Sequence, residues 1–273
     1  MEWSKAKNIL IVLLLLVDTF LLGIYIFRAE EENSGHENIR TEICTVLKKQ
    51  GIEISKNMIP LDSMEFNPAT VDVREMKREE IGKLLGNITE TTSEDYTTFS
   101  GENGTFMYNK DSFSLVYESG KPIYGAESAK KLSEEIASAL SVRTNSEAFR
   151  YGKSDGGYTV KIPQIISGIE LFDCSIEIKI SESGSVIAHG SYLCDGEITT
   201  YSDKVSTVSA VMLSFADAVK EKGISGINVS DVRVGYMAKA SDSKRVSLAP
   251  AIGIETDSGL FLVDMQTERV YVE

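Results

Sequence analysis

The feature that most restricts the fold of this chain is an apolar run of 19 residues near its start, Ile9 to Phe27, which contains one ionisable side chain, Asp18. As an α-helix this run would rise roughly 28 Å, close to the thickness of the hydrocarbon core of a bilayer. A cleavable signal peptide has a shorter apolar region, of about 7–15 residues, and ends at a small-residue cleavage site. Here the run ends in aromatic residues and Arg28. We therefore predict an uncleaved transmembrane helix over residues 9–27.

The charges on either side of this segment predict its orientation. Lys5 and Lys7 precede it, whereas Arg28 is followed by the glutamates at 30–32. Because lysine and arginine flanks stay in the cytoplasm, we expect residues 1–8 to be a cytoplasmic tail of a single-pass protein of the cell membrane. Residues 28–38 are then a polar tether to an extracellular C-terminal domain. The formal net charge of −13 argues against a nucleic-acid partner, because binding phosphates needs clustered Lys and Arg.

Beyond the tether, helical and strand patterns follow one another twice. Apolar residues at helical spacing predict four helices, over residues 38–50, 77–86, 127–141 and 205–222. In the last of these, Ala210, Leu213 and Val219 are expected to face a sheet. This order predicts an α+β fold of two similar subdomains, in which antiparallel sheets are each packed by helices. The N-terminal subdomain is expected to cover residues 39–125 and the C-terminal subdomain residues 126–273.

The strongest strand pattern lies in the C-terminal half of the chain. From Phe172 to Ile180, apolar residues alternate with polar ones, which predicts a strand with one buried and one solvated face. A turn at Ser183–Gly184 predicts that this strand forms a long hairpin over residues 169–195. Three more strands are expected after residue 226.

The external part of the chain has few of the signals expected of an enzyme. It has two histidines, no zinc-type cysteine spacing, no Walker loop and no dinucleotide-binding glycine motif. Ser128 and Lys131 match the S-x-x-K nucleophile motif of penicillin-recognising enzymes, but the companion motifs are missing. We interpret Ser128 as a helix-start residue and Lys131 as a solvated lysine. The sequence thus predicts no catalytic residues, no metal site and no cofactor.

Two of the three cysteines lie in the predicted hairpin. If its loop has three residues centred on Gly184, Cys174 and Cys194 fall opposite each other, and an oxidising exterior would permit a disulfide. The alternative is that both are small buried residues on a strand face. The sequence leaves both interpretations open.

Taken together, several motifs resemble the YycH/YycI family, the regulators of the WalK (YycG) sensor kinase of low-GC Gram-positive bacteria, and YycI is the more similar in size. The opening W-x-K-x-K flank and the L/V-D-x-F-L-L element of the apolar run look like the start of the family. Further residues resemble its strand entry and its L-G-Y strand: Gln164, Gly168, Leu171, Phe172, Gly235 and Tyr236. Ile252 departs from the pattern, because the family usually has tryptophan there. Residues 36–125 match in pattern alone.

The resemblance implies a non-enzymatic, membrane-anchored accessory regulator. Such a protein would bind and modulate a WalK/YycG-type sensor histidine kinase that controls cell-wall metabolism, together with a YycH-like protein. A charge within a membrane helix costs about 2.5–3.5 kcal/mol on insertion scales and usually faces a partner, so Asp18 and Thr19 are expected to contact the helices of the kinase complex. Otherwise Asp18 is a tolerated polar residue that Thr19 helps to satisfy. The alternative function is an anchored wall-associated enzyme or a module that binds wall fragments.

Overall fold

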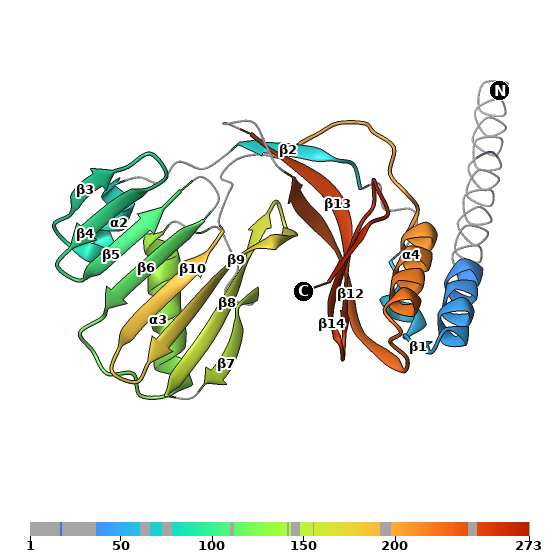
Figure 1. The fold of residues 1–273 in the computed structure, drawn as a ribbon, viewed down its shortest axis with the longest axis horizontal. Helices are drawn as coiled ribbons and strands as arrows, with labels where there is room; N and C mark the ends of the chain where they lie inside the picture. Colours follow the sequence, from blue (N-terminus) through green and yellow to red (C-terminus); the bar gives the residue numbers. More distant parts are fainter. Residues whose placement is uncertain are drawn as a thin grey trace, which may run out of the picture.

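The protein folds into two lobes that share one continuous sheet (Figure 1). The computed structural model describes residues 17, 37–60, 66–72, 78–109, 112–140, 142, 148–154, 156–191, 198–239 and 245–272. Lobe 1 comprises residues 78–190, and lobe 2 comprises residues 37–72 and 198–272. Each lobe has its own hydrophobic core, so the fifteen described strands belong to one sheet but not to one core.

Lobe 1 is an antiparallel sheet with two helices behind it in Figure 1. Its strands, in chain order, are β3 (Thr89–Thr92), β4 (Thr97–Gly101), β5 (Gly104–Tyr108), β6 (Phe113–Glu118), β7 (Arg150–Ser154), β8 (Gly157–Ile166), β9 (Ile169–Ser181) and β10 (Ser185–Gly190). The helices are α2 (Arg78–Leu85) and α3 (Ala126–Ala139). Ile81 of α2 and Ile136 of α3 pack in one core with Phe99, Phe106 and Leu115 of the sheet. The other face of the sheet carries the polar half of the alternating pattern.

Lobe 2 is built on its two longest strands, β12 (Ile227–Lys239) and β13 (Arg245–Thr256). Its other strands are β1 (Ile52–Glu53), β2 (Ala69–Asp72), β11 (Thr199–Thr200), β14 (Gly259–Asp264) and β15 (Val270–Val272). Its helices are residues 37–49, a 3-10 turn at Lys56–Met58 and α4 (Val208–Glu221). Figure 1 shows the helix 37–49 beside α4. Leu47 and Phe215, one from each helix, share a core with Ile254 and Phe261 of the sheet.

Helix α4 is held by a cap and by one apolar stripe. The side chain of Thr207 accepts a hydrogen bond from the backbone N–H of Ala210, which satisfies one of the free donors of the first turn. Val211, Phe215 and Val219 are buried at spacings of four residues. Leu213 lies about 200° around the helix from Phe215. It is 45% exposed, so the prediction that Leu213 faces the sheet is wrong, whereas Val219 is buried as predicted.

The predicted fold class is also wrong. The described chain is mostly β, and its strands form one sheet rather than the separate sheets of two similar subdomains. The reason is long-range pairing: β6 pairs with β10 and β2 pairs with β13, so strand edges that a local pattern leaves open are completed by distant segments. The predicted membrane helix over residues 9–27 lies outside the described residues apart from Val17. Among the described residues, no helix has the length and apolar character needed to cross a membrane.

Strand β9 connects the two lobes. Its C-terminal part pairs with β10 from Ile176 to Ile180, and its N-terminal end pairs with β12 through Glu170 and Leu171. Strand β8 pairs with β9 along both parts. The tip of the β8–β9 hairpin therefore reaches out of lobe 1 and adds to the sheet of lobe 2.

The hairpin tip has the backbone of a tight two-residue turn. Ile166 pairs with Ile169, and the residues between them, Ser167 and Gly168, have φ values of 52° and 83°. Two successive positive φ values are typical of a type I′ turn, whose twist matches that of the flanking strands. Gly168 is thus required by the backbone of this turn.

We predict that truncating Phe215 destabilises the protein far more than truncating Leu213. Phe215 is fully buried and its ring meets that of Phe261 edge-on, with centroids 5.1 Å apart. Phe215→Ala should lower the free energy of unfolding by about 3–5 kcal/mol, whereas a change on the exposed face, Leu213→Ala, should cost under about 1 kcal/mol. Chemical denaturation measures both values. Similar losses for the two variants would contradict the described packing of α4.

Candidate functional site

The junction between the lobes is formed by an irregularity in β9. Pro163 of β8 pairs with Ser175 of β9, but the next residue of β8, Gln164, pairs with Leu171. The register therefore shifts by three residues of β9, Phe172 to Cys174, which form a bulge. A bulge bends its strand and re-aims its side chains. Here it lies where β9 passes from the sheet of lobe 1 to the sheet of lobe 2.

Phe172, the first bulge residue, lies on a floor of small residues in lobe 2. Gly235 pairs with Ala251 across β12 and β13, and Gly253 is two residues further along the same face. A Cβ atom at Gly235 would come within 2.7 Å of the Phe172 ring, and one at Gly253 within 2.9 Å. Real Cβ atoms do not approach so closely, so only glycine lets the ring lie this near the backbone. Phe172 is 5% exposed and packs with Ala251 and Leu262.

Leu171 and Cys174, on either side of Phe172 and Asp173, pack on the opposite face of the lobe 2 sheet. Leu171 and Cys174 are fully buried in a cluster with Tyr236 of β12 and Leu248 of β13. The hydroxyl of Tyr236 donates a hydrogen bond of 2.9 Å to the carbonyl of Asn67, and burial raises the pKa of this phenol. Side chains of β9 therefore pack against both faces of the lobe 2 sheet at the junction.

Asp173, the second bulge residue, extends the backbone pairing between the lobes. Its carboxylate accepts hydrogen bonds from the backbone N–H of Ala238 in β12, at 3.0 Å to Oδ1 and 2.9 Å to Oδ2. Hydrogen bonds to an ionised acceptor are stronger than neutral ones. The side chain thus satisfies a strand donor that lies two residues beyond the last β9–β12 pair.

A chain of ion pairs also crosses the junction. Arg150 of β7 lies 3.7 Å from Glu170 of β9, and Glu170 lies 2.6 Å from Arg233 of β12. Arg233 also contacts Asp231 at 2.9 Å and Glu255 at 3.3 Å. Its guanidinium lies 6.0 Å from the centre of the Phe172 ring, within the range of a cation–π contact. Arg233 thus joins these ion pairs to the Phe172 ring, whose floor of Gly235, Ala251 and Gly253 is called the Phe172 seat.

The outer face of lobe 1, opposite α2 and α3, is the second feature of interest. Val116 of β6 is directly opposite Ile187 of β10, and Met107 of β5 lies diagonally from Val116. These three side chains are 40–50% exposed, and no helix in the described part of the chain covers them. Strand β9, beside β10, carries Lys179 and Glu177, which form an ion pair of 3.2 Å.

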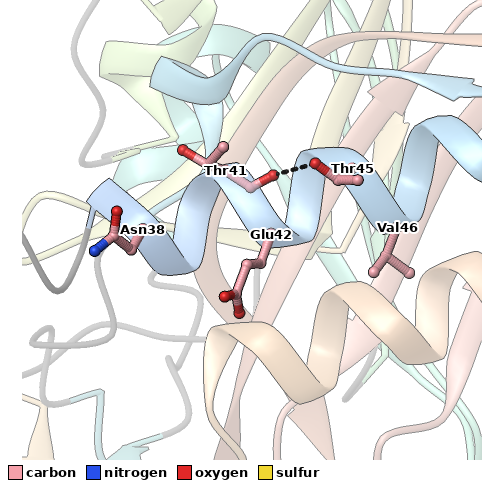
Figure 2. Close-up of a pocket in the computed structure, with 5 residues that line it drawn as sticks. All are labelled: Asn38, Thr41, Glu42, Thr45 and Val46. Carbon is pink, nitrogen blue, oxygen red and sulfur yellow. Dashed lines mark hydrogen bonds between the residues drawn. The ribbon is translucent and has the colours of Figure 1, made fainter.

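A third feature is a shallow hollow of about 550 Å³ on the helix 37–49 (Figure 2). It is lined by Asn38, Thr41, Glu42, Thr45 and Val46. The hydroxyl of Thr41 donates to the carbonyl of Glu37, and that of Thr45 donates to the carbonyl of Thr41, as the dashed line in Figure 2 marks. Both hydroxyls thus bond to their own helix.

The structure does not bring the residues predicted from the sequence into one site. Asp18 and Thr19 lie outside the described residues. The hydroxyl of Ser128 donates to the carbonyl of Tyr124 at the start of α3, and Lys131 is exposed. Among the described residues, no group of three or more His, Cys, Asp or Glu side chains is placed to hold a metal ion.

The hairpin register differs from the one used to place the two cysteines opposite each other. Val186 pairs with Ile180 and Gly190 with Ile176, so the turn is centred on Ser183 rather than on Gly184. Cys174 is buried in the bulge, and Cys194 lies outside the described residues. The disulfide between them stays a prediction.

The comparisons with known proteins concern the fold. No family model and no curated protein matches the sequence. Among solved structures, the chain is similar to an uncharacterised protein from Eubacterium rectale ATCC 33656, with a TM-score of 0.53 and 13% identity over 76% of this chain and 86% of that one. The C-terminal domain of Bacillus megaterium YpeB is a weak neighbour, with a TM-score of 0.34 and 13% identity over 84% of this chain and 96% of that one. At such identities the first likeness shows a shared fold, and the second carries no argument.

The packing of Phe172 on lobe 2 was not predicted from the sequence, although the chain contains a signal for it. Ala249, Ala251 and Gly253 alternate along β13, so they place small residues at successive positions on one face. Together with Gly235 on β12, this pattern predicts a floor on which a large side chain can lie. It does not identify which side chain, because the bulge in β9 is not visible in the sequence.

We predict that removing the carboxylate of Asp173 destabilises the junction. Asp173→Ala leaves the N–H of Ala238 without its acceptor, which should lower the free energy of unfolding by about 1–3 kcal/mol. The matched control is Asp217→Ala on the exposed face of α4, which should change it by under about 0.5 kcal/mol. Denaturation curves of the two variants provide the measurement. Equal stabilities would contradict the role given to Asp173.

Proposed function

We propose that this chain is a membrane-anchored accessory regulator that binds and modulates a WalK/YycG-type sensor histidine kinase controlling cell-wall metabolism. The observation that carries the proposal is the convergence of the residues that resemble the YycH/YycI family. Leu171 and Phe172 are more than 60 residues from Gly235 and Tyr236 in the sequence, yet Leu171 pairs with Tyr236 and Phe172 contacts Gly235 at the junction of the lobes. Their proximity supports the proposal, because residues chosen by resemblance from two distant segments lie in one structural feature.

The proposed partners are the kinase and a YycH-like protein, and the proposed place is the cell membrane, with an extracellular C-terminal domain. These follow from the same resemblance and from the apolar run with its Lys and Glu flanks. Within this run, Asp18 and Thr19 are proposed to contact the partner, because an ionisable side chain at such a position is usually functional.

The outer face of lobe 1 is the proposed external contact. Its centre is the apolar trio Met107, Val116 and Ile187, which is contiguous, whereas isolated exposed apolar residues are common and need no explanation. The paired residues around the trio are mostly Ser, Thr and Lys. An apolar centre with a polar rim is the usual arrangement of a protein–protein interface.

We expect Asp18→Leu to weaken co-purification of the full chain with the kinase from detergent-solubilised membranes. Polar contacts between membrane helices contribute about 0.6–2 kcal/mol, so the affinity should fall about 3- to 30-fold. Asp18→Asn keeps the hydrogen-bonding ability and should behave like the unchanged protein. Equal recovery of the Asp, Asn and Leu forms would contradict a partner contact at this position.

The external contact is tested separately by Ile187→Asp. A carboxylate in the middle of the apolar trio should reduce binding to the kinase at least about tenfold if the trio is buried in the complex. The control is Val272→Asp, which places the same charge on an exposed strand residue of lobe 2. If the two variants bind equally well, the outer face of lobe 1 is not the contact.

A further inference from the structure

We propose that the bulge Phe172–Cys174 is an interlock that holds the two lobes as one rigid body. Without its three side chains, β9 would act as a hinge between the lobes. This inference is independent of the function proposed above, because it rests on the contacts of the junction alone.

The need for an interlock follows from how little backbone pairing joins the lobes. Strand β9 pairs with β12 through two residue pairs, Glu170 with Gly235 and Leu171 with Tyr236. By contrast, β12 and β13 pair over ten positions within lobe 2. A two-stranded pairing with few bonds is marginal in water even when it is longer than this. Side chains must therefore supply most of the stiffness of the junction.

Phe172 supplies stiffness because its ring is buried in close contact with the backbone of lobe 2. The ring lies against the backbone of Gly235 and Gly253 and is enclosed by Ala251 and Leu262. Rotating β9 relative to β12 would lift the ring from this floor and expose it to water, while Leu171 and Cys174 would leave the cluster on the opposite face. Movement in either direction thus breaks packing on one side of the sheet.

The polar contacts oppose the remaining movements, which are sliding of β9 along β12 and separation of the lobes. Asp173 ties the bulge to the backbone of Ala238, so sliding of β9 along β12 breaks both of its hydrogen bonds. Glu170 lies between Arg150 of lobe 1 and Arg233 of lobe 2, which opposes separation of the lobes at the edge of the seat. Rotation, sliding and separation are therefore each opposed by a different contact.

A rigid junction has a consequence for communication through the molecule. The outer face of lobe 1 and the helix 37–49 of lobe 2 lie on different lobes (Figure 1). If the lobes move as one body, a partner that reorients lobe 1 also reorients this helix. If the lobes are hinged, β9 bends when lobe 1 is reoriented, and the helix 37–49 is not reoriented with it.

The interlock is tested by measuring the distance between the lobes in the full chain. Spin labels carried by non-canonical residues at Ser138 of α3 and Asp217 of α4, both exposed, leave the native cysteines unchanged. Pulsed electron–electron double resonance should give one narrow distribution of label-to-label distances for the protein with the unchanged junction. Phe172→Ala should give a clearly broader distribution. The matched control is Phe106→Ala, which truncates a fully buried phenylalanine within lobe 1 and should leave the distance narrow and unchanged.

A second variant decides the question if Phe172→Ala does not fold. Gly253→Ala keeps the ring but places a methyl group 2.9 Å from it, so the ring must leave its seat. A shifted or broadened interlobe distance in this variant supports the interlock. A narrow distance equal to that of the unchanged protein, in whichever of the two junction variants folds, would overturn it.

Discussion

The contact on which the architecture depends is the seat of the Phe172 ring on a floor of backbone. Two glycines, Gly235 and Gly253, remove the Cβ atoms that would otherwise hold the ring away from β12 and β13. Each glycine in a strand lowers the local stability, because it adds no side chain to pack and loses more entropy on folding. In this chain the loss is offset by burying an aromatic side chain between two lobes that have separate cores. The long strand β9 can serve both lobes because its bulge turns one end toward lobe 2.

The sequence predicted the local elements better than their assembly. Helices α3 and α4 and the alternating strand β9 follow from the period of their apolar residues, which is a local property. The single sheet was not predicted, because strand pairing such as β2 with β13 joins segments more than 170 residues apart. Leu213 was wrongly assigned to the buried face together with Val219, although at 100° per residue the two lie about 120° apart around the helix. The buried stripe is Val211, Phe215 and Val219.

At the candidate site, too, individual residues were selected from the sequence but their assembly was not predicted. Leu171, Phe172 and Tyr236 were selected from the sequence by resemblance, but their packing at the junction depends on the bulge in β9. The bulge itself has no sequence signature, since Phe172, Asp173 and Cys174 continue the alternation of a regular strand. Pattern-based reasoning fails at this point because an irregularity in pairing is a property of two strands, not of one.

The two proposals depend on different parts of the molecule. Regulation of a kinase is proposed from the family resemblance, the apolar N-terminal run and the uncovered outer face of lobe 1. The interlock is proposed from distances and burial at the junction. In a regulator that acts mechanically, a stiff junction would carry the effect of a contact on one lobe to the other lobe.

A junction at β9 that holds the two lobes as one rigid body should also make them unfold as one cooperative unit. Native-state hydrogen exchange tests this directly, by comparing the backbone amides of Ile178 in lobe 1 and Ile254 in lobe 2, which are both buried in strand ladders. The account predicts that both amides exchange with the same free energy of opening, equal to that of global unfolding, and that the amide of Ala238 at the junction is also protected. Different opening free energies for Ile178 and Ile254, with rapid exchange at Ala238, would contradict it.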